Sequence, residues 1–131
     1  MTKVFMDTNA ILYYLSDRNI LSVKAEFVIS FITEIEVLSY PDLTKKEEEK
    51  INKFFENIYI VDLNKDIKKC TINFRRRYSL KLPDAIICAS AYFLKIPLIT
   101  NDKKLFKVSE CCVITYSEFK ARYTVNKAGL E

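Results

Sequence analysis

Two acidic residues directly follow apolar runs and are candidates for chemistry at the edge of a sheet. Asp7 comes after Val4-Phe5-Met6, and Asp102 comes two residues after the apolar run that ends at Thr100. Ligands of open α/β sheets bind beyond the carboxyl ends of the strands. If both runs are strands of one parallel sheet, both side chains are expected to face one crevice.

Two further acids are predicted on helices. Asp84 follows Pro83 at the start of the most apolar helix of the chain, which we expect to be buried at the centre. The helix dipole favours an ionised carboxylate at this position. Glu36 lies one turn into a short helix, but Glu34 competes with it as the inward-facing acid, and Thr33 with Glu36 also fits a capping box. Each acid alone is also typical of a turn or a cap, so residue type and spacing leave both interpretations open.

Four carboxylates at one place would have a specific chemistry. Mg²⁺ and Mn²⁺ are hard cations that prefer carboxylate and water oxygens, usually together with the phosphate oxygens of a substrate. Crowded carboxylates repel one another, which raises at least one pKa and makes the cluster costly without a cation. The four acids therefore predict a divalent metal site suited to phosphodiester hydrolysis.

The composition excludes several other mechanisms. The chain has 131 residues and no histidine, which removes every mechanism that depends on an imidazole. The single glycine, Gly129, stands near the end of the chain, so neither a P-loop nor a G-x-G-x-x-G turn can bind nucleotide phosphates. Any general base must be a carboxylate or a water bound to a metal.

Charge and cysteine usage suggest the setting in which the protein works. The net charge is +4, a mild indication of polyanion binding that strengthens if metal neutralises the acids. No two cysteines are spaced as C-x-x-C, so we expect free thiols that pack as small apolar groups in a reducing, cytoplasmic location. No apolar run is long enough to span a bilayer, which predicts a soluble protein. The cysteines are Cys70, Cys88, Cys111 and Cys112.

Apolar strands alternate with amphipathic helices along the chain, which predicts a mostly parallel sheet of about five strands in a three-layer α/β/α sandwich. Strands are expected at residues 4–6, 27–30, 58–61, 97–100 and 112–115. Helices are expected from residue 10, at 33–39, from the capping box of Thr44 and Glu47, at 66–78, at 85–94 and from residue 117. The segment 16–21 is expected to be a loop. We expect one domain, residues 1–123, followed by a flexible tail, residues 124–131, whose Leu130 and Glu131 resemble a vector remnant.

Four segments, "VFMDTNAILYYL", "ISFITEIEVL", "LPDAIICASAYFL" and "LITNDKKLF", resemble in this order the PIN-domain nucleases, and among them the VapC-type toxins of type II toxin–antitoxin systems. The resemblance covers about residues 3–119. It implies that Asp7, Glu36, Asp84 and Asp102 are catalytic and bind the metal, and it favours Glu36 over Glu34. Supporting roles beside the acids are implied for Thr8, Asn9, Thr33, Thr100 and Asn101.

The same resemblance implies an activity and partners. It implies Mg²⁺- or Mn²⁺-dependent endonucleolytic cleavage of RNA, a homodimer, and a cognate antitoxin whose C-terminal segment blocks the active site. The chain departs from the family in two places: many relatives have a glycine where this chain has Lys95-Ile96-Pro97, and the stretch between the first helix and the second strand is short. Neither departure affects an acid.

The predicted helix 66–78 carries a basic outer face. Lys68, Lys69, Arg75 and Arg76 are candidates for contacts with the RNA backbone, because Lys and Arg supply most non-specific affinity for nucleic acids. A charged helix face is also commonly just solvated, and three consecutive arginines, ending at Arg77, cannot all lie on one side of a helix.

Two other classes of function fit part of the pattern. A catalytically silent PIN-like scaffold would bind RNA or a protein through the same fold, although the presence of all four acids argues against it. A receiver-type domain of similar length would accept a phosphoryl group on Asp62 beside Asp7, but it needs a second acid where Thr8 stands.

Overall fold

The computed structural model describes residues 1–127 and has a five-stranded parallel sheet at its centre, in the order β4-β3-β1-β5-β6. Its strands are β1 (Lys3–Met6), β3 (Glu26–Ser30), β4 (Tyr59–Val61), β5 (Leu98–Ile99) and β6 (Val113–Ile114). The predicted α/β/α sandwich with a parallel sheet of about five strands is confirmed.

The strand order places a topological switch at the centre of the sheet. From β1 the chain adds β3 and then β4 on one side, and later adds β5 and β6 on the other side. Met6 pairs with Ile99, so the carboxyl ends of β1 and β5 lie next to each other. Crevices at such switch points are the usual ligand sites of open α/β sheets.

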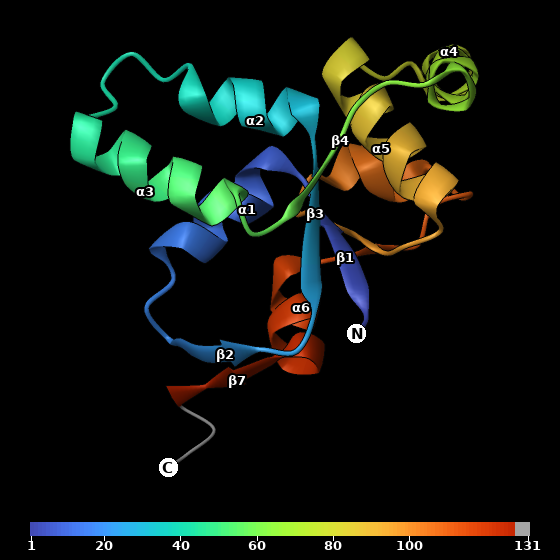
Figure 1. Cartoon of the computed structure of the whole chain (residues 1–131). Helices are drawn as coiled ribbons and strands as arrows, with labels where there is room; N and C mark the ends of the chain where they lie inside the picture. The colour runs from blue at the N-terminus through green and yellow to red at the C-terminus, as the bar shows by residue number, and fades with distance from the viewer. Residues whose placement is uncertain (128–131) are drawn as a thin grey trace.

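Helices cover both faces of the sheet (Figure 1). They are α1 (Thr8–Ser16), α2 (Phe31–Leu38), α3 (Lys45–Phe55), α4 (Lys65–Tyr78), α5 (Leu82–Leu94) and α6 (Tyr116–Tyr123), with the 3-10 helix η1 (Lys103–Lys107). Buried residues of α1, α2, α3 and α6 pack on one face, and those of α4, α5 and η1 pack on the other. The capping box predicted at Thr44 and Glu47 begins α3.

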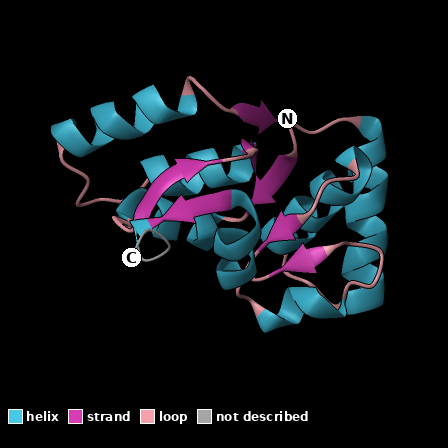
Figure 2. Cartoon of the chain, turned by 90° about the horizontal axis from the view of Figure 1, so that it is seen from below, coloured by secondary structure: helices cyan, strands magenta, loops and turns pink. Residues whose placement is uncertain are grey.

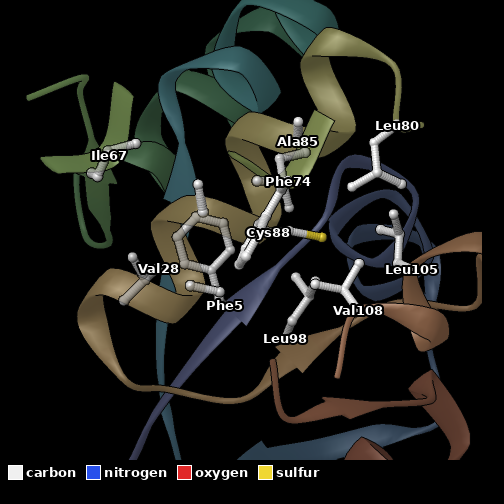
Figure 3. Packing of buried hydrophobic residues seen from close by; sticks show 13 residues of the cluster. Phe5, Val28, Ile67, Phe74, Leu80, Ala85, Cys88, Leu98, Leu105 and Val108 are labelled. Carbon is white, nitrogen blue, oxygen red and sulfur yellow. The ribbon is translucent and has the colours of Figure 1, made fainter. Parts of the chain in front are cut away.

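Alternation along the strands divides the core between these two faces. On β1, Val4 and Met6 belong to the cluster under α1, α2 and α6, whereas Phe5 points to the opposite face. There Phe5 lies among Phe74 of α4 and Cys88 of α5 (Figure 3). Each strand is thus apolar on both faces, as expected for a covered parallel sheet.

A second sheet was not predicted. Strand β2 (Ile20–Val23) pairs antiparallel with β7 (Thr124–Asn126) in a separate two-stranded sheet (Figure 2). The loop expected at 16–21 therefore ends in a strand, and the tail expected from residue 124 begins with one. Both segments are short, and their partners are about a hundred residues apart, so no local pattern indicates the pairing. The rest of the predicted tail, residues 128–131 with Leu130 and Glu131, lies outside the described residues.

Helix α5 is less buried than predicted at its C-terminal end. Residues 85–91 are buried, but Tyr92, Phe93 and Leu94 are 36–47% exposed. A 13-residue helix is about 20 Å long, whereas a four-residue strand spans about 13 Å, so the helix extends past the sheet.

The cysteines differ in burial, although all were expected to pack as small apolar groups. All four cysteines are free; Cys88 is buried and Cys112 is exposed. Within residues 1–127, no helix has both the length and the apolar character required to cross a membrane.

Candidate active site

Asp7 is the central acid of the site. It directly follows β1 and caps α1, where its Oδ1 accepts a hydrogen bond of 2.7 Å from the backbone N–H of Ala10. Its Oδ2 accepts a hydrogen bond from the hydroxyl of Thr100, at the end of β5. The residue is only 7% exposed, so these two donors compensate for much of the water that the carboxylate loses.

Asp102 lies beside Asp7 across the switch point. Its backbone N–H donates a 3.0 Å hydrogen bond to the Thr100 hydroxyl, the same group that donates to Asp7. The Asp102 carboxylate caps η1 by accepting from the N–H of Lys104 at 3.0 Å. Thr100 therefore connects the two acids and fixes the distance between the strand ends.

Glu36 reaches the site from α2. Its Oε1 accepts a 2.6 Å hydrogen bond from the hydroxyl of Thr8, which also lies 2.9 Å from the hydroxyl of Thr33. Thr33 is buried, so this pair of hydroxyls ties α2 to the start of α1. Glu34, the competing acid, makes no side-chain hydrogen bond or ion pair within residues 1–127. Of the two glutamates, only Glu36 is therefore bonded to Thr8, the residue that follows Asp7, within residues 1–127.

Asp84 lies in the first turn of α5, and its charge interacts with the other acids. Burial raises the pKa of Asp84, and the negative charges of Asp102 and Glu36 raise it further. Burial also raises the pKa of Asp7, against the hydrogen bonds from Thr100 and Ala10, and the charges of Asp102 and Asp84 add to the rise. All four predicted acids therefore belong to one electrostatic neighbourhood, in which each negative charge disfavours the next.

The arrangement is a group of repelling acids and not a closed ligand cage. Within the described part of the chain, no three side chains of the metal-binding types are placed so that they could hold an ion together. The donor set nevertheless fits a hard divalent cation: all four groups are carboxylates, and the nearest supporting groups are hydroxyls. A cation would also relieve the repulsion that raises the pKa values of Asp7 and Asp84.

The predicted supporting residues divide into two groups. Thr8, Thr33 and Thr100 make the hydrogen bonds described above, so the structure places them beside the acids. Asn101 instead accepts a 3.0 Å hydrogen bond from the backbone N–H of Tyr116, which positions the start of α6. Asn9 is exposed, and its side chain has no hydrogen-bond partner within residues 1–127.

Two lysines near the acids were not predicted. Lys81 and Lys104 both lower the pKa of Asp84, against the effects of burial and of the other acids. Lys81 precedes Asp84 by three residues and Lys104 follows Asp102 by two, so proximity in sequence to a predicted acid was the available signal.

The basic face of α4 is exposed as predicted, but its residues differ in their surroundings. Arg77 forms an ion pair of 2.7 Å with Glu110. Lys69 and Arg76 line a hollow on the surface, and Arg75 and Arg76 line a neighbouring one, whereas Lys68 lines neither.

Comparison with known proteins identifies the family. A family model described as the PIN domain matches residues 4–110, and the chain belongs to this family. No curated protein matches the sequence.

Solved structures with the same fold include toxin–antitoxin complexes. A complex from Klebsiella pneumoniae matches with 28% identity and a TM-score of 0.70, over 86% of this chain and 97% of that chain. VapBC from Salmonella typhimurium, bound to DNA, matches with 16% identity and a TM-score of 0.74, over 88% and 99%. VapBC-1 from nontypeable Haemophilus influenzae matches with 21% identity and a TM-score of 0.68, over 88% and 99%. The predicted resemblance to VapC-type PIN domains is therefore confirmed in family and fold.

The strand order also removes the receiver-type alternative. Asp62 follows β4, which lies at the edge of the sheet, and β3 separates β4 from β1. Asp62 is thus not beside Asp7, as a phosphoacceptor site of that type would require.

Proposed function

We propose that this protein is a metal-dependent endoribonuclease that hydrolyses RNA phosphodiester bonds and acts as the toxin of a toxin–antitoxin pair. The observation that carries the proposal is the position of Asp7 at the carboxyl end of β1, beside the switch point, where the charges of Asp102 and Asp84 act on it and the charge of Glu36 acts on Asp84. The membership of the PIN domain family supports the same conclusion.

The four acids would hold Mg²⁺ or Mn²⁺ at the carboxyl ends of β1 and β5. The bound ion would lower the pKa of the attacking water and neutralise the charge that develops on the phosphate. Thr100 keeps Asp7 oriented, and Thr8 does the same for Glu36. Lys81 and Lys104 carry positive charge near Asp84, where they would attract the phosphate of the substrate.

A partly apolar groove supports an antitoxin as the partner. It has a volume of about 400 Å³ and lies between α1, α2 and α3. Leu15 and Tyr40, which line it, are 38% and 46% exposed. We propose that an apolar segment of the cognate antitoxin occupies this groove, in keeping with the toxin–antitoxin complexes that share the fold. A short neighbouring gene, encoding a small DNA-binding protein that co-purifies with this chain, would support the assignment. We also propose a homodimer, on the family resemblance, to be tested by light scattering.

The central experiment is cleavage of a mixed pool of small RNAs by purified, antitoxin-free protein. Reactions contain Mg²⁺ or Mn²⁺, with EDTA as one control and Asp84→Asn as another. Asp62→Asn is the matched control, because it removes an exposed carboxylate at the edge strand. Fragments that require metal and Asp84, but not Asp62, are expected. A folded protein that binds metal and leaves every RNA intact would favour the silent scaffold.

A further inference from the structure

The outward face of α4 carries two adjacent hollows that share one arginine. The larger, of about 780 Å³, is lined by Lys69, Arg76 and Tyr92 among others. The smaller, of about 460 Å³, is lined by Arg75, Arg76 and Leu80 among others. The two hollows are separate and have Arg76 in common, and we refer to them together as the depression along α4.

This depression leads toward the acids. Leu80, at its near end, is followed by Lys81, the N-cap residue of α5, and Asp84 lies in the first turn of that helix. Arg75 is held against the loop between α4 and α5, since its Nε donates a 3.3 Å hydrogen bond to the carbonyl of Leu80. Positive charge therefore continues from Lys81 through Arg75 to Arg76, on the α4–α5 side of the sheet (Figure 1).

The cations of the depression are available for a ligand. Glu110 lines the larger hollow but is already paired with Arg77. Within residues 1–127, neither Lys69 nor Arg76 takes part in an ion pair, and both are exposed. Asp66 is the remaining acid of the lining and is outnumbered by the two free cations.

An exposed aromatic ring lies at the far end. Tyr92 is 47% exposed, and its ring makes a T-shaped contact with Phe74, with the centroids 5.8 Å apart. Eight residues separate Tyr92 from Asp84 on α5, which corresponds to about 12 Å along the helix axis. A groove of cations with an exposed aromatic ring is the usual arrangement for single-stranded nucleic acid, whose bases stack on the ring while its phosphates meet the cations.

We propose that this depression, which we name the α4 track, binds single-stranded RNA that extends from the acids past Lys81, with phosphates on Arg75, Arg76 and Lys69 and a base stacked on Tyr92. The inference rests on the proposed ribonuclease function. It adds where the RNA runs, from the acids past Lys81 to Tyr92, and that a longer RNA makes more contacts. A substrate of two nucleotides reaches the acids without reaching Tyr92, whereas an RNA of about twelve nucleotides contacts the whole track.

The test compares Lys69→Gln/Arg76→Gln with a control that removes two charges elsewhere. Lys45→Gln/Lys53→Gln is that control, because both lysines are exposed on α3 and line neither hollow. Cleavage is measured on a twelve-nucleotide single-stranded RNA and on a dinucleotide. The track variant is expected to lose about tenfold in kcat/KM on the long RNA, mainly through KM, and to cleave the dinucleotide as the wild type does. Tyr92→Ala is expected to show the same pattern.

A binding experiment separates this inference from the nuclease proposal. Fluorescence anisotropy with the twelve-nucleotide RNA is measured in the Asp84→Asn background over a range of salt concentrations. Loss of two phosphate contacts is expected to reduce the slope of log affinity against log salt by about 1.4. If the wild type cleaves RNA but the track variant behaves like the control on the long substrate, the track is wrong. If the wild type cleaves nothing, equal binding by the track variant and its control overturns the track, and weaker binding supports it. If the track variant loses as much affinity for duplex RNA as for single-stranded RNA, the choice of single-stranded RNA as the ligand is contradicted.

Discussion

The hydroxyl of Thr100 donates a hydrogen bond to Oδ2 of Asp7, a residue 93 positions earlier in the chain. The same hydroxyl accepts from the N–H of Asp102. One side chain thus orients the central acid and fixes the turn that carries another acid.

Replacement of Thr100 by valine should show this role. Thr100→Val keeps the shape of the side chain but leaves the buried Asp7 with only the Ala10 donor, which should raise the pKa of Asp7 still further. We expect the free energy of unfolding to fall by about 1–3 kcal/mol and metal-dependent cleavage to fall about 10- to 100-fold. Chemical denaturation and RNA cleavage measure the two effects. Thr100→Ser, which keeps the donor, should stay near the wild type; equal losses in both variants would contradict the role of the hydroxyl.

The two glutamates of α2 allow a paired comparison. Glu36 accepts from Thr8 and interacts with the charge of Asp84, whereas Glu34 does neither. Glu36→Gln is therefore expected to reduce metal-dependent cleavage about 10- to 100-fold, and Glu34→Gln to leave it within about twofold. Kinetics on one RNA with saturating Mn²⁺ provide the measurement. The reverse order of effects would assign the site to Glu34.

Without metal, the raised pKa of Asp84 should make the acid site a source of instability. A carboxyl group whose pKa is higher in the folded than in the unfolded protein binds more protons when folded, so stability falls as the pH rises through that window. Asp84→Asn is thus expected to have little effect below the ordinary carboxyl pKa of 3.8 and to be stabilising above the raised value. Because Asp84 is only partly buried, we expect a gain of about 1–3 °C in Tm at neutral pH.

The measurement is thermal unfolding of both proteins in EDTA at several pH values. Asp62→Asn, which changes an exposed carboxylate, serves as the control. A constant difference between wild type and Asp84→Asn across the pH range would argue against a raised pKa of Asp84 in the folded protein.

Lys95 has a left-handed backbone conformation, with φ 57° and ψ 42°, at the C-terminus of α5. Such positions favour glycine, because a Cβ atom crowds the following carbonyl group. Lys95→Gly is expected to stabilise the protein by about 0.5–1 kcal/mol, or about 2–6 °C in Tm. Lys95→Ala keeps the Cβ atom and should give no gain. Equal Tm values for the two variants would show that backbone strain is not the cause.

The fold could be predicted largely because its strongest signals are local. The run Val4-Phe5-Met6 is apolar on both faces, and the capping box at Thr44 starts α3 where expected. The pairing of Ser22 with Val125 could not be predicted, since neither short segment carries its own hydrophobic pattern. The burial of helix α5 was predicted wrongly at its C-terminal end for a different reason. An apolar composition indicates which residues can be buried, but the length of the sheet determines which of them are covered.

The site was predictable as a set of residues but not as a set of contacts. Strand ends identify Asp7 and Asp102, because the carboxyl ends of parallel strands meet at one edge. The hydrogen bonds that orient them depend on the register between β1 and β5, which places Thr100 next to Asp7. The sequence also contains no direct sign that Lys81 lies at the beginning of a basic depression, since that depression arises from the turn between α4 and α5.

The central position of β1 has a consequence for the time at which the proposed toxin becomes active. The ribosome makes Asp7 some ninety residues before β5, the strand that flanks β1 on the other side. A nascent chain that ends within α4 has neither Asp84 nor Asp102. It also lacks β5, so Asp7 has no hydrogen bond from Thr100. The proposed toxin would therefore lack a complete acid site throughout most of its synthesis.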